Sequence, residues 1–338
     1  MTLDSLERLE SFALLGPGFG NGSFVLLQGL QECSAARDDS HAQLVFASYG
    51  AAGREARIFE PSSISQCAEP LCPALEQPIV RFEDAGIRQA IDRIREAIAA
   101  GDVYQVCFTV RAKLDATCGS ALLSAMCAGG APRFAAWVRL PGGPEFVSAS
   151  PECFFEVEGR RVRSEPMKGT AAPGQGANLE SSAKDISELA MITDLVRNDL
   201  TRVCEPRSVK VSCARRKLEL PYAIQMVSDV EGVLRKGNGP LEVLDALHPG
   251  GSVTGAPKES ALEMIRLLES TPRGPYCGAL GLWQGDHAMF SLLIRTASRT
   301  ATGWEYGVGS GIVWDSDADA EVQEFRTKLG ALGCGSPP

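Results

Sequence analysis

The sequence lacks the features of several protein classes, and each absence disfavours a kind of function. Its 33 lysines and arginines are outnumbered by 42 acidic residues, and the net charge of −9 disfavours nucleic acid as a partner. It has only three histidines, and none of its eleven cysteines forms a Cys-x-x-Cys pair, so a zinc site and a disulfide framework are both disfavoured. The N-terminus has no signal-peptide pattern and no uncharged apolar run is long enough to span a membrane, which predicts a cytoplasmic location away from membranes.

What the sequence does contain is typical of a globular protein with a sizeable core, with 44% hydrophobic and 22% charged residues over 338 positions. This length allows two domains, although large sheet proteins are often single units. Strand patterns occur at Ser23–Gln28 and Leu44–Ala47, and the proline-rich stretch Cys67–Pro78 is typical of a linker. We expect residues 1–80 to contribute strands to the same compact unit as a catalytic core over residues 81–338.

From Ile87 the pattern becomes helical and stops at Gly101; a strand then runs from Val103 to Leu114. One face of that strand is polar, and the pattern alone favours a face that meets water. Strands outnumber helices and mostly follow one another, which predicts antiparallel sheets with helices outside rather than a doubly wound sheet. Further strands are expected at Arg133–Leu140, Glu145–Ser148, Ser208–Cys213, Gly278–Trp283, Met289–Thr296 and Trp304–Val313, and helices at Lys184–Leu200, Pro257–Glu269 and Ala318–Leu332.

The stretch from Ser164 to Thr170 places Lys168 between a proline and a glycine, on constrained backbone that can aim its amine. Such a lysine becomes a nucleophile or base if desolvation lowers its pKa. Taken alone, the pattern is more typical of a solvated surface lysine in a turn.

Two helices each carry a pair of carboxylates three residues apart, so that both members lie on one helix face. If the two faces meet, their oxygens form a cage suited to Mg²⁺, a hard cation that takes one or two protein carboxylates directly. The alternative is two ordinary solvated helix faces. The pairs are Asp185 with Glu188 and Glu321 with Glu324.

Three glycine-rich or charged stretches allow both structural and ligand-binding interpretations. The run His248–Lys258 leads into a helix that Ser252 or Thr254 could cap, and its backbone N–H groups could also bind an anion. The run Gly307–Gly311 precedes a strand pattern, which excludes a dinucleotide-binding fingerprint. Arg295 follows an apolar strand and needs a carboxylate or a ligand as partner.

Six blocks, in this order, together resemble the chorismate-utilising enzymes, a family that includes component I of anthranilate synthase and of aminodeoxychorismate synthase. The resemblance covers about Gly101 to Leu332, and six ordered blocks make a chance match negligible. It implies an α+β fold in which two large, mainly antiparallel sheets pack as a sandwich with helices outside. The blocks are GDVYQV, SPE, PMKGT, KDISELAMITDLVRNDL, PGGSVTGAPK with RGPYCGALG, and GSGIVWDSDADAEVQE.

The resemblance assigns roles position by position. Glu152 matches the general acid that protonates the departing 4-hydroxyl of chorismate. Glu188 and Glu324 match the carboxylates that hold Mg²⁺, with Asp185 and Glu321 behind them. The groups around the ring carboxylate are Gly169, Thr170, Thr254 and Lys328, and those that cradle the enolpyruvyl carboxylate are Tyr276, Arg295, Gly309 and Gly311.

Two positions distinguish the branches of the family. Gln105 stands where members that add water carry a lysine base, so it resembles the amine-adding branch. Lys168 stands where anthranilate synthases carry alanine, and Pro-x-Lys-Gly-Thr looks like aminodeoxychorismate synthase, in which the lysine attacks the ring at C2 and ammonia then enters at C4. The implied product is 4-amino-4-deoxychorismate, a precursor of 4-aminobenzoate and folate.

Three departures accompany the resemblance. Gln225 stands where anthranilate synthases usually carry a histidine tied to pyruvate elimination, which again favours the aminodeoxychorismate branch. Asp185 is shorter than the glutamate of salicylate synthases, which leaves its metal role open. The N-terminal region is shorter than in long members that bind tryptophan there, so we expect a tryptophan site to be absent or vestigial.

The resemblance also implies a partner. Component I enzymes take ammonia from a separate glutamine amidotransferase, and the chain contains no Gly-x-Cys-x-Gly nucleophile motif of its own. We therefore expect an amidotransferase subunit as partner and free ammonia as a substitute at higher pH. The alternatives are anthranilate synthase component I and a non-catalytic chorismate-binding subunit.

Overall fold

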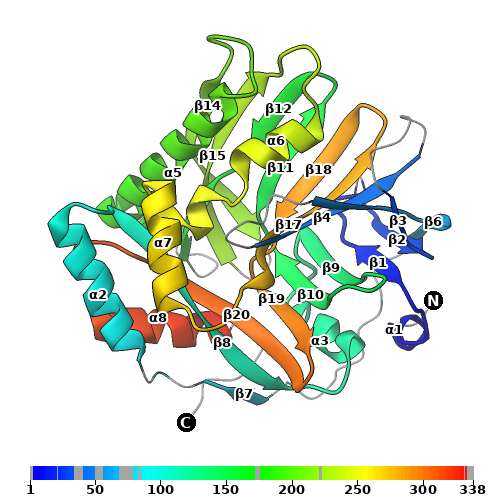
Figure 1. Ribbon diagram of the computed structural model, residues 1–338, viewed down its shortest axis with the longest axis horizontal. Coiled ribbons are helices and arrows are strands. Elements are labelled where there is room, and N and C mark those ends of the chain that lie inside the picture. The colour runs from blue at the N-terminus through cyan, green and yellow to red at the C-terminus, as the bar shows by residue number, and fades with distance from the viewer. Residues whose placement is uncertain are drawn as a thin grey trace.

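The computed structural model describes residues 3–20, 22–33, 41–49, 56–67, 79–82, 84, 86–171, 176–220, 223–330 and 332. These residues form two ten-stranded sheets whose strand pairs are all antiparallel, with helices along their flanks (Figure 1). The expected α+β fold, with two large antiparallel sheets and helices outside, is confirmed. Within the described part of the chain, no helix combines the length and apolar character needed to cross a membrane.

The first sheet has the strand order β16-β8-β20-β19-β10-β9-β1-β2-β6, with β7 pairing beside β16 on β8. Its strands are β1 (Phe12–Leu15), β2 (Phe24–Gln28), β6 (Ser63–Cys67), β7 (Ile79–Arg81), β8 (Gln105–Asp115), β9 (Phe134–Arg139), β10 (Glu145–Ser150), β16 (Gly255–Ala256), β19 (Thr296–Thr300) and β20 (Gly303–Ile312).

In the second sheet, β15 pairs with β13 and β12 on one side and with β14 on the other, and the order continues β12-β11-β18-β17-β4-β5-β3. Its strands are β3 (Gln31–Cys33), β4 (Gln43–Tyr49), β5 (Ala56–Glu60), β11 (Cys153–Glu158), β12 (Arg161–Ser164), β13 (Met167–Ala171), β14 (Lys210–Leu220), β15 (Ala223–Val233), β17 (Gly274–Gln284) and β18 (His287–Leu292).

Strands from the first 67 residues enter both sheets, since β1 pairs with β9 and β4 pairs with β17. The expected linker beyond Cys67 lies outside the described residues. The helices among the described residues are α1 (Leu3–Leu6), α2 (Ile87–Ala100), α3 (Gly119–Met126), α4 (Gly176–Ser181), α5 (Ala183–Thr201), α6 (Pro240–Leu247), α7 (Lys258–Leu268) and α8 (Ala318–Gly330), and a 3₁₀ turn spans Gly251–Val253.

The two faces of β8 explain where the interior of the protein lies. Its apolar face packs under helices α2, α7 and α8, and Phe108 contacts the ring of Phe325 on α8 (Figure 1). The opposite face, with Gln105 and Thr109, is also buried. The expectation that this polar face meets water is therefore wrong, because helices cover one face and the second sheet approaches the other.

Several local expectations need correction. The expected strand Met289–Thr296 is two strands, and Arg295 lies between them with φ of +50°. Helix α7 begins after Pro257 with no side-chain cap, so neither Ser252 nor Thr254 caps it. Helix α2, by contrast, ends as expected at Gly101, whose φ of +83° favours glycine. Helices α3 and α6 and strand β15 were not anticipated from the pattern.

Candidate active site

Strand β13 holds Lys168 at the edge where the two sheets meet. The strand pairs with β15, but its register shifts between Lys168 and Thr170, with Gly169 at φ of +74°. A Cβ atom at Gly169 would lie 3.1 Å from Cγ of Asp185, so a side chain there would collide with the start of α5. The irregular backbone around Gly169 therefore brings the strand close to the helix that carries the first carboxylate pair.

The amine of Lys168 points inward and forms an ion pair with Glu188 on α5, with 3.0 Å between Nζ and Oε2. Burial acts to lower the pKa of Lys168, but the charge and hydrogen bond of Glu188 outweigh it and hold the pKa above its ordinary value. The condition set by the sequence, a pKa lowered by desolvation, is therefore not met while Glu188 is the partner.

The amide of Gln105 lies beside this amine across a glycine of β20. A Cβ atom at Gly311 would lie 2.9 Å from Nε2 of Gln105 and 3.1 Å from Nζ of Lys168. Both polar atoms of the Gln105 side chain are buried without a hydrogen-bond partner, as is the hydroxyl of Thr109. Unpaired buried polar groups are costly, so these side chains mark a place where polar ligand atoms can bind.

Glu152 follows β10 and is almost fully buried. Burial raises the pKa of its carboxyl to about 8, against the opposing effects of a hydrogen bond from Ser252 (3.2 Å) and the charge of Lys168. A carboxyl that keeps its proton at neutral pH is suited to act as a general acid.

The carboxylates of α5 and α8 share cationic partners. The ammonium of Lys184 lies 4.0 Å from Oε1 of Glu188 and 3.8 Å from Oε1 of Glu321, so the two helices face a common space. Glu321 is buried and accepts hydrogen bonds from the hydroxyls of Ser310 (2.6 Å) and Ser316 (2.7 Å).

The second carboxylate of α8, Glu324, is held by another lysine. Its Oε1 lies 2.7 Å from Nζ of Lys328, which also donates to the carbonyl of Gly309 (2.7 Å). Burial acts to raise the pKa of Glu324, but the charge and hydrogen bond of Lys328 outweigh it and leave the pKa below its ordinary value. This carboxylate is therefore ionised at neutral pH.

The oxygen-only donor set of Asp185, Glu188, Glu321 and Glu324 has the chemistry that Mg²⁺ prefers. As the side chains lie, however, the described residues contain no group of three or more histidine, cysteine, aspartate or glutamate side chains placed to hold a metal ion. The oxygens of Glu188 and Glu324 instead contact ammonium groups. Binding of a divalent cation would therefore require these ion pairs to open.

The remaining predicted contacts are placed as follows. Thr254 is buried, and its hydroxyl donates to the carbonyl of Gly250 (2.7 Å). Tyr276 lies in β17 rather than before it, and its ring packs against Gly307, where a Cβ atom would lie 2.2 Å from the ring. The guanidinium of Arg111 covers that ring at 5.1 Å from its centre. Arg295 is half-buried at the turn between β18 and β19.

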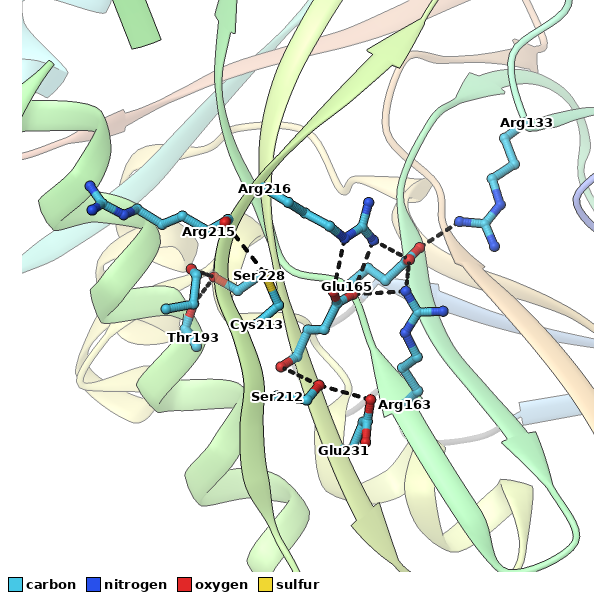
Figure 2. A network of polar contacts seen from close by, with 12 residues as sticks. Arg133, Arg163, Glu165, Thr193, Ser212, Cys213, Arg215, Arg216, Ser228 and Glu231 are labelled. Carbon is cyan, nitrogen blue, oxygen red and sulfur yellow. Dashed lines mark hydrogen bonds and ion pairs between the residues drawn. The ribbon is translucent and has the colours of Figure 1, made fainter. Parts of the chain in front are cut away.

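The sequence did not reveal a cluster of arginines and carboxylates around Glu165, three residues before Lys168 (Figure 2). In this arginine-paired cluster, Glu165 and Asp229 are held by Arg133, Arg163 and Arg216. Arg163 donates to both carboxylates, at 2.6 Å from Oε1 of Glu165 and 2.8 Å from Oδ1 of Asp229. Arg216 does the same from β14, at 2.6 Å and 3.0 Å.

The arginine-paired cluster fixes the chain on both sides of the site. The amide of Glu165 donates to the carbonyl of Cys153 (3.3 Å), the neighbour of Glu152, and the amide of Ser228 donates to the carbonyl of Pro166 (3.0 Å). Arg163 and Arg216 lie on two separate strands and Arg133 lies in the turn before β9, so they give no periodic signal and their convergence could not be found from the sequence. Lys184, by contrast, begins the KDISE block, and its place in the site was missed although the block itself was recognised.

The profile of the family described as chorismate binding enzyme matches residues 25–333. Two relatives named anthranilate synthase component 1 are similar to this chain. The first, from Haloarcula marismortui, is 35% identical over 280 residues, covering 77% of this chain and 57% of that protein. The second, from Aeropyrum pernix, is 34% identical over 284 residues, covering 80% and 63%.

A relative named aminodeoxychorismate synthase, from Streptomyces pristinaespiralis, is 36% identical over 263 residues, covering 72% of this chain and 36% of that protein. The chain thus spans only part of the length of these relatives. Solved structures share the fold. Anthranilate synthase component I from Streptococcus pneumoniae superposes with a TM-score of 0.76 at 20% identity, covering 96% of this chain and 90% of that one.

The menaquinone-specific isochorismate synthase MenF from Escherichia coli superposes with a TM-score of 0.78 at 18% identity, covering 97% of this chain and 89% of that one. At these identities the similarity to solved structures shows the fold alone. The family profile matches most of the sequence and therefore shows the family. The chain belongs to the family of chorismate binding enzymes.

Proposed function

We propose that this chain is component I of aminodeoxychorismate synthase and converts chorismate and ammonia to 4-amino-4-deoxychorismate. The observation that carries the proposal is the position of Lys168, whose amine points inward beside the unpaired amide of Gln105 and the glycine strand of β20. A lysine that served only as a surface charge would not be directed into a buried polar space between two sheets.

In the proposed reaction the free amine of Lys168 forms a bond to C2 of the ring, the ring double bond shifts, and the C4–O bond breaks. Glu152 gives its proton to the departing hydroxyl, which leaves as water. Ammonia then bonds to C4, the bond between C2 and Lys168 breaks, and the new ammonium group returns a proton to Glu152. The sum is chorismate plus ammonia giving the amino product plus water.

We further propose that Mg²⁺ is required, held by Glu188 and Glu324 with Asp185 and Glu321 behind them, and that it would neutralise the ring carboxylate of chorismate. Thr254 and Lys328, with the backbone of Gly169 and Thr170, would border that carboxylate. Tyr276, Arg295, Gly309 and Gly311 would border the enolpyruvyl group.

Ammonia would come from glutamine through a separate amidotransferase subunit, in a cytoplasmic pathway that leads to 4-aminobenzoate and folate. The name of the Streptomyces relative supports this branch. The second candidate is anthranilate synthase component I, which is favoured by the names of the Haloarcula and Aeropyrum relatives.

The two candidates differ in product, so one assay separates them. The chain is incubated with chorismate, Mg²⁺ and ammonium, and the products are read as anthranilate fluorescence and, with a purified lyase, as 4-aminobenzoate. The wild type is expected to give 4-aminobenzoate, and Lys168→Ala is expected to lose it. Undiminished aminodeoxychorismate synthesis by Lys168→Ala would exclude the covalent role, and a gain of anthranilate by that variant would support the branch assignment.

A further inference from the structure

Three lysines contact three of the four carboxylates that are proposed to bind the metal. Lys168 pairs with Glu188, Lys184 lies between Glu188 and Glu321, and Lys328 pairs with Glu324. We call these side chains, together with Glu321, the lysine-paired cluster. In this state the proposed nucleophile and the proposed metal ligand neutralise each other.

We propose that Lys168 and a divalent cation compete for the Glu188 carboxylate, so that the ion pair stores the lysine as an ammonium until the metal binds. Once displaced, the buried ammonium gives its proton to water and becomes the amine that attacks the substrate. This inference rests on the proposed function, because it takes Lys168 as the attacking group and Glu188 as a metal ligand. It adds an order of events: the cation binds before the amine can react.

The burial of the pair is the first support for this exchange. The side chains of Lys168 and Glu188 are only 17% and 12% exposed, so water solvates neither charge well. An ammonium and a doubly charged cation cannot both use the same buried oxygens without strong repulsion between them. Coordination of a cation by Glu188 therefore has to break the contact with Lys168.

The route open to the released amine is the second support. Lys184 and Lys328 are 54% and 45% exposed, so a cation can push either of them into water at little cost. Lys168 has no such exit, and its amine lies over Gly311 beside the side-chain amide of Gln105, whose two polar atoms are buried without a hydrogen-bond partner. The displaced amine therefore stays inside the site, next to an unsatisfied amide.

The exchange is tested by calorimetric titration of metal-free protein with Mg²⁺ alone. Lys168→Met removes the competing charge and keeps the length of the side chain, so it is expected to bind Mg²⁺ about tenfold more tightly than the wild type. Lys168→Arg removes the nucleophilic amine but keeps the charge, and is expected to stay within about threefold of the wild type. Lys328→Met, at an exposed pair, is expected to gain less than about threefold.

The exchange would be overturned if Lys168→Met bound Mg²⁺ no more tightly than the wild type, or if the Met and Arg variants gained affinity equally. It would also be overturned if none of these proteins bound Mg²⁺. A second measurement needs no variant: in a structure of the wild type with Mg²⁺, Nζ of Lys168 should lie more than about 4 Å from Glu188, outside ion-pair range. A contact that stays at 3.0 Å with the cation bound overturns the proposal. Neither measurement contains chorismate, so failure of the exchange leaves the product assignment standing. An anthranilate product would remove the attacking role of Lys168 but leave its competition with the cation for Glu188 intact.

Discussion

The lysine-paired cluster and the arginine-paired cluster both bring carboxylates together with cations, but they are built from different chemistry. In the arginine-paired cluster, Arg163 and Arg216 each bridge the two carboxylates, so these two arginines and both carboxylates have several partners (Figure 2). In the lysine-paired cluster each ammonium is a point charge on a flexible stem. The comparison teaches that forked guanidinium groups fix a position, whereas single ammonium groups allow charges to be exchanged.

The same contrast appears in the pKa values. Burial acts to raise the pKa of Asp229, but hydrogen bonds from Arg216 and Arg163 outweigh it and hold the pKa below its ordinary value. Glu152 is buried with only a serine hydroxyl bonded to its carboxylate, and its pKa rises to about 8. Glu152 and Asp229 are thus kept in opposite protonation states by the number of cations around them.

The largest effect is expected from a substitution that removes the acidic proton of Glu152, the proton that distinguishes it from the paired carboxylates. Glu152→Gln keeps the shape and the buried position but cannot donate a proton to the departing hydroxyl, so kcat is expected to fall by about 10³-fold. Steady-state kinetics with chorismate and ammonium measures it, with thermal unfolding as the control for the fold. A variant with more than about a tenth of the wild-type kcat would contradict the role of general acid.

The next effect tests whether the arginine-paired cluster is a structural anchor. Glu165→Gln leaves Arg133 without its carboxylate and leaves Asp229 as the one carboxylate for Arg163 and Arg216, and is expected to lower the free energy of unfolding by about 3 kcal/mol. Glu324→Gln, whose side chain is 41% exposed, serves as the matched control and is expected to cost less than about 1 kcal/mol in metal-free protein. Urea unfolding of both variants gives the comparison, and equal losses would remove the distinction between the clusters.

A change of pH sharpens the contrast at a single group. Glu152 must hold a proton to act as an acid, and its pKa is about 8, so the protonated fraction is nearly complete below that value and falls above it. Infrared difference titration of the wild type against Glu152→Gln is expected to show the band of the protonated Glu152 carboxyl up to about pH 8 and its loss above that value. A band already lost at about pH 6 would show that the proton comes from another group.

The smallest effect is expected when arginine and lysine are exchanged for each other in the two clusters. Arg216→Lys keeps the charge but loses the fork that reaches Glu165 and Asp229 together, and is expected to cost about 1 kcal/mol of unfolding free energy. Lys328→Arg, at an exposed ion pair, is expected to change it by less than about 0.5 kcal/mol. If the two exchanges cost the same, fork geometry is not what stabilises the arginine-paired cluster.

Much of the fold could be predicted because its signals are local. The spacing of isoleucines gave α2, and Gly101 gave its end. Strand β8 was also predicted, but the burial of its polar face was not. Burial of Gln105 depends on the second sheet rather than on its neighbours in sequence. The break at Arg295 was missed for a similar reason, since a positive φ at a non-glycine residue leaves no mark in the pattern.

In the candidate site, too, local motifs could be predicted whereas contacts between distant segments could not. The blocks that hold Lys168, Glu188 and Glu324 were visible as short motifs, and the structure brings these stretches to one end of the two sheets. That Lys168 pairs with Glu188 could not be anticipated, because the pair joins a strand and a helix whose approach depends on the irregular backbone at Gly169. The arginine-paired cluster depends on the register of β12, β14 and β15, which no single segment specifies.

The hydrogen bond from the amide of Glu165 to the carbonyl of Cys153 has a mechanical consequence. One end of this bond is adjacent in sequence to Glu152, and the other lies three residues before Lys168. We therefore expect a displacement of either segment to carry Glu152 and Lys168, the proposed proton donor and the proposed attacking amine, along together.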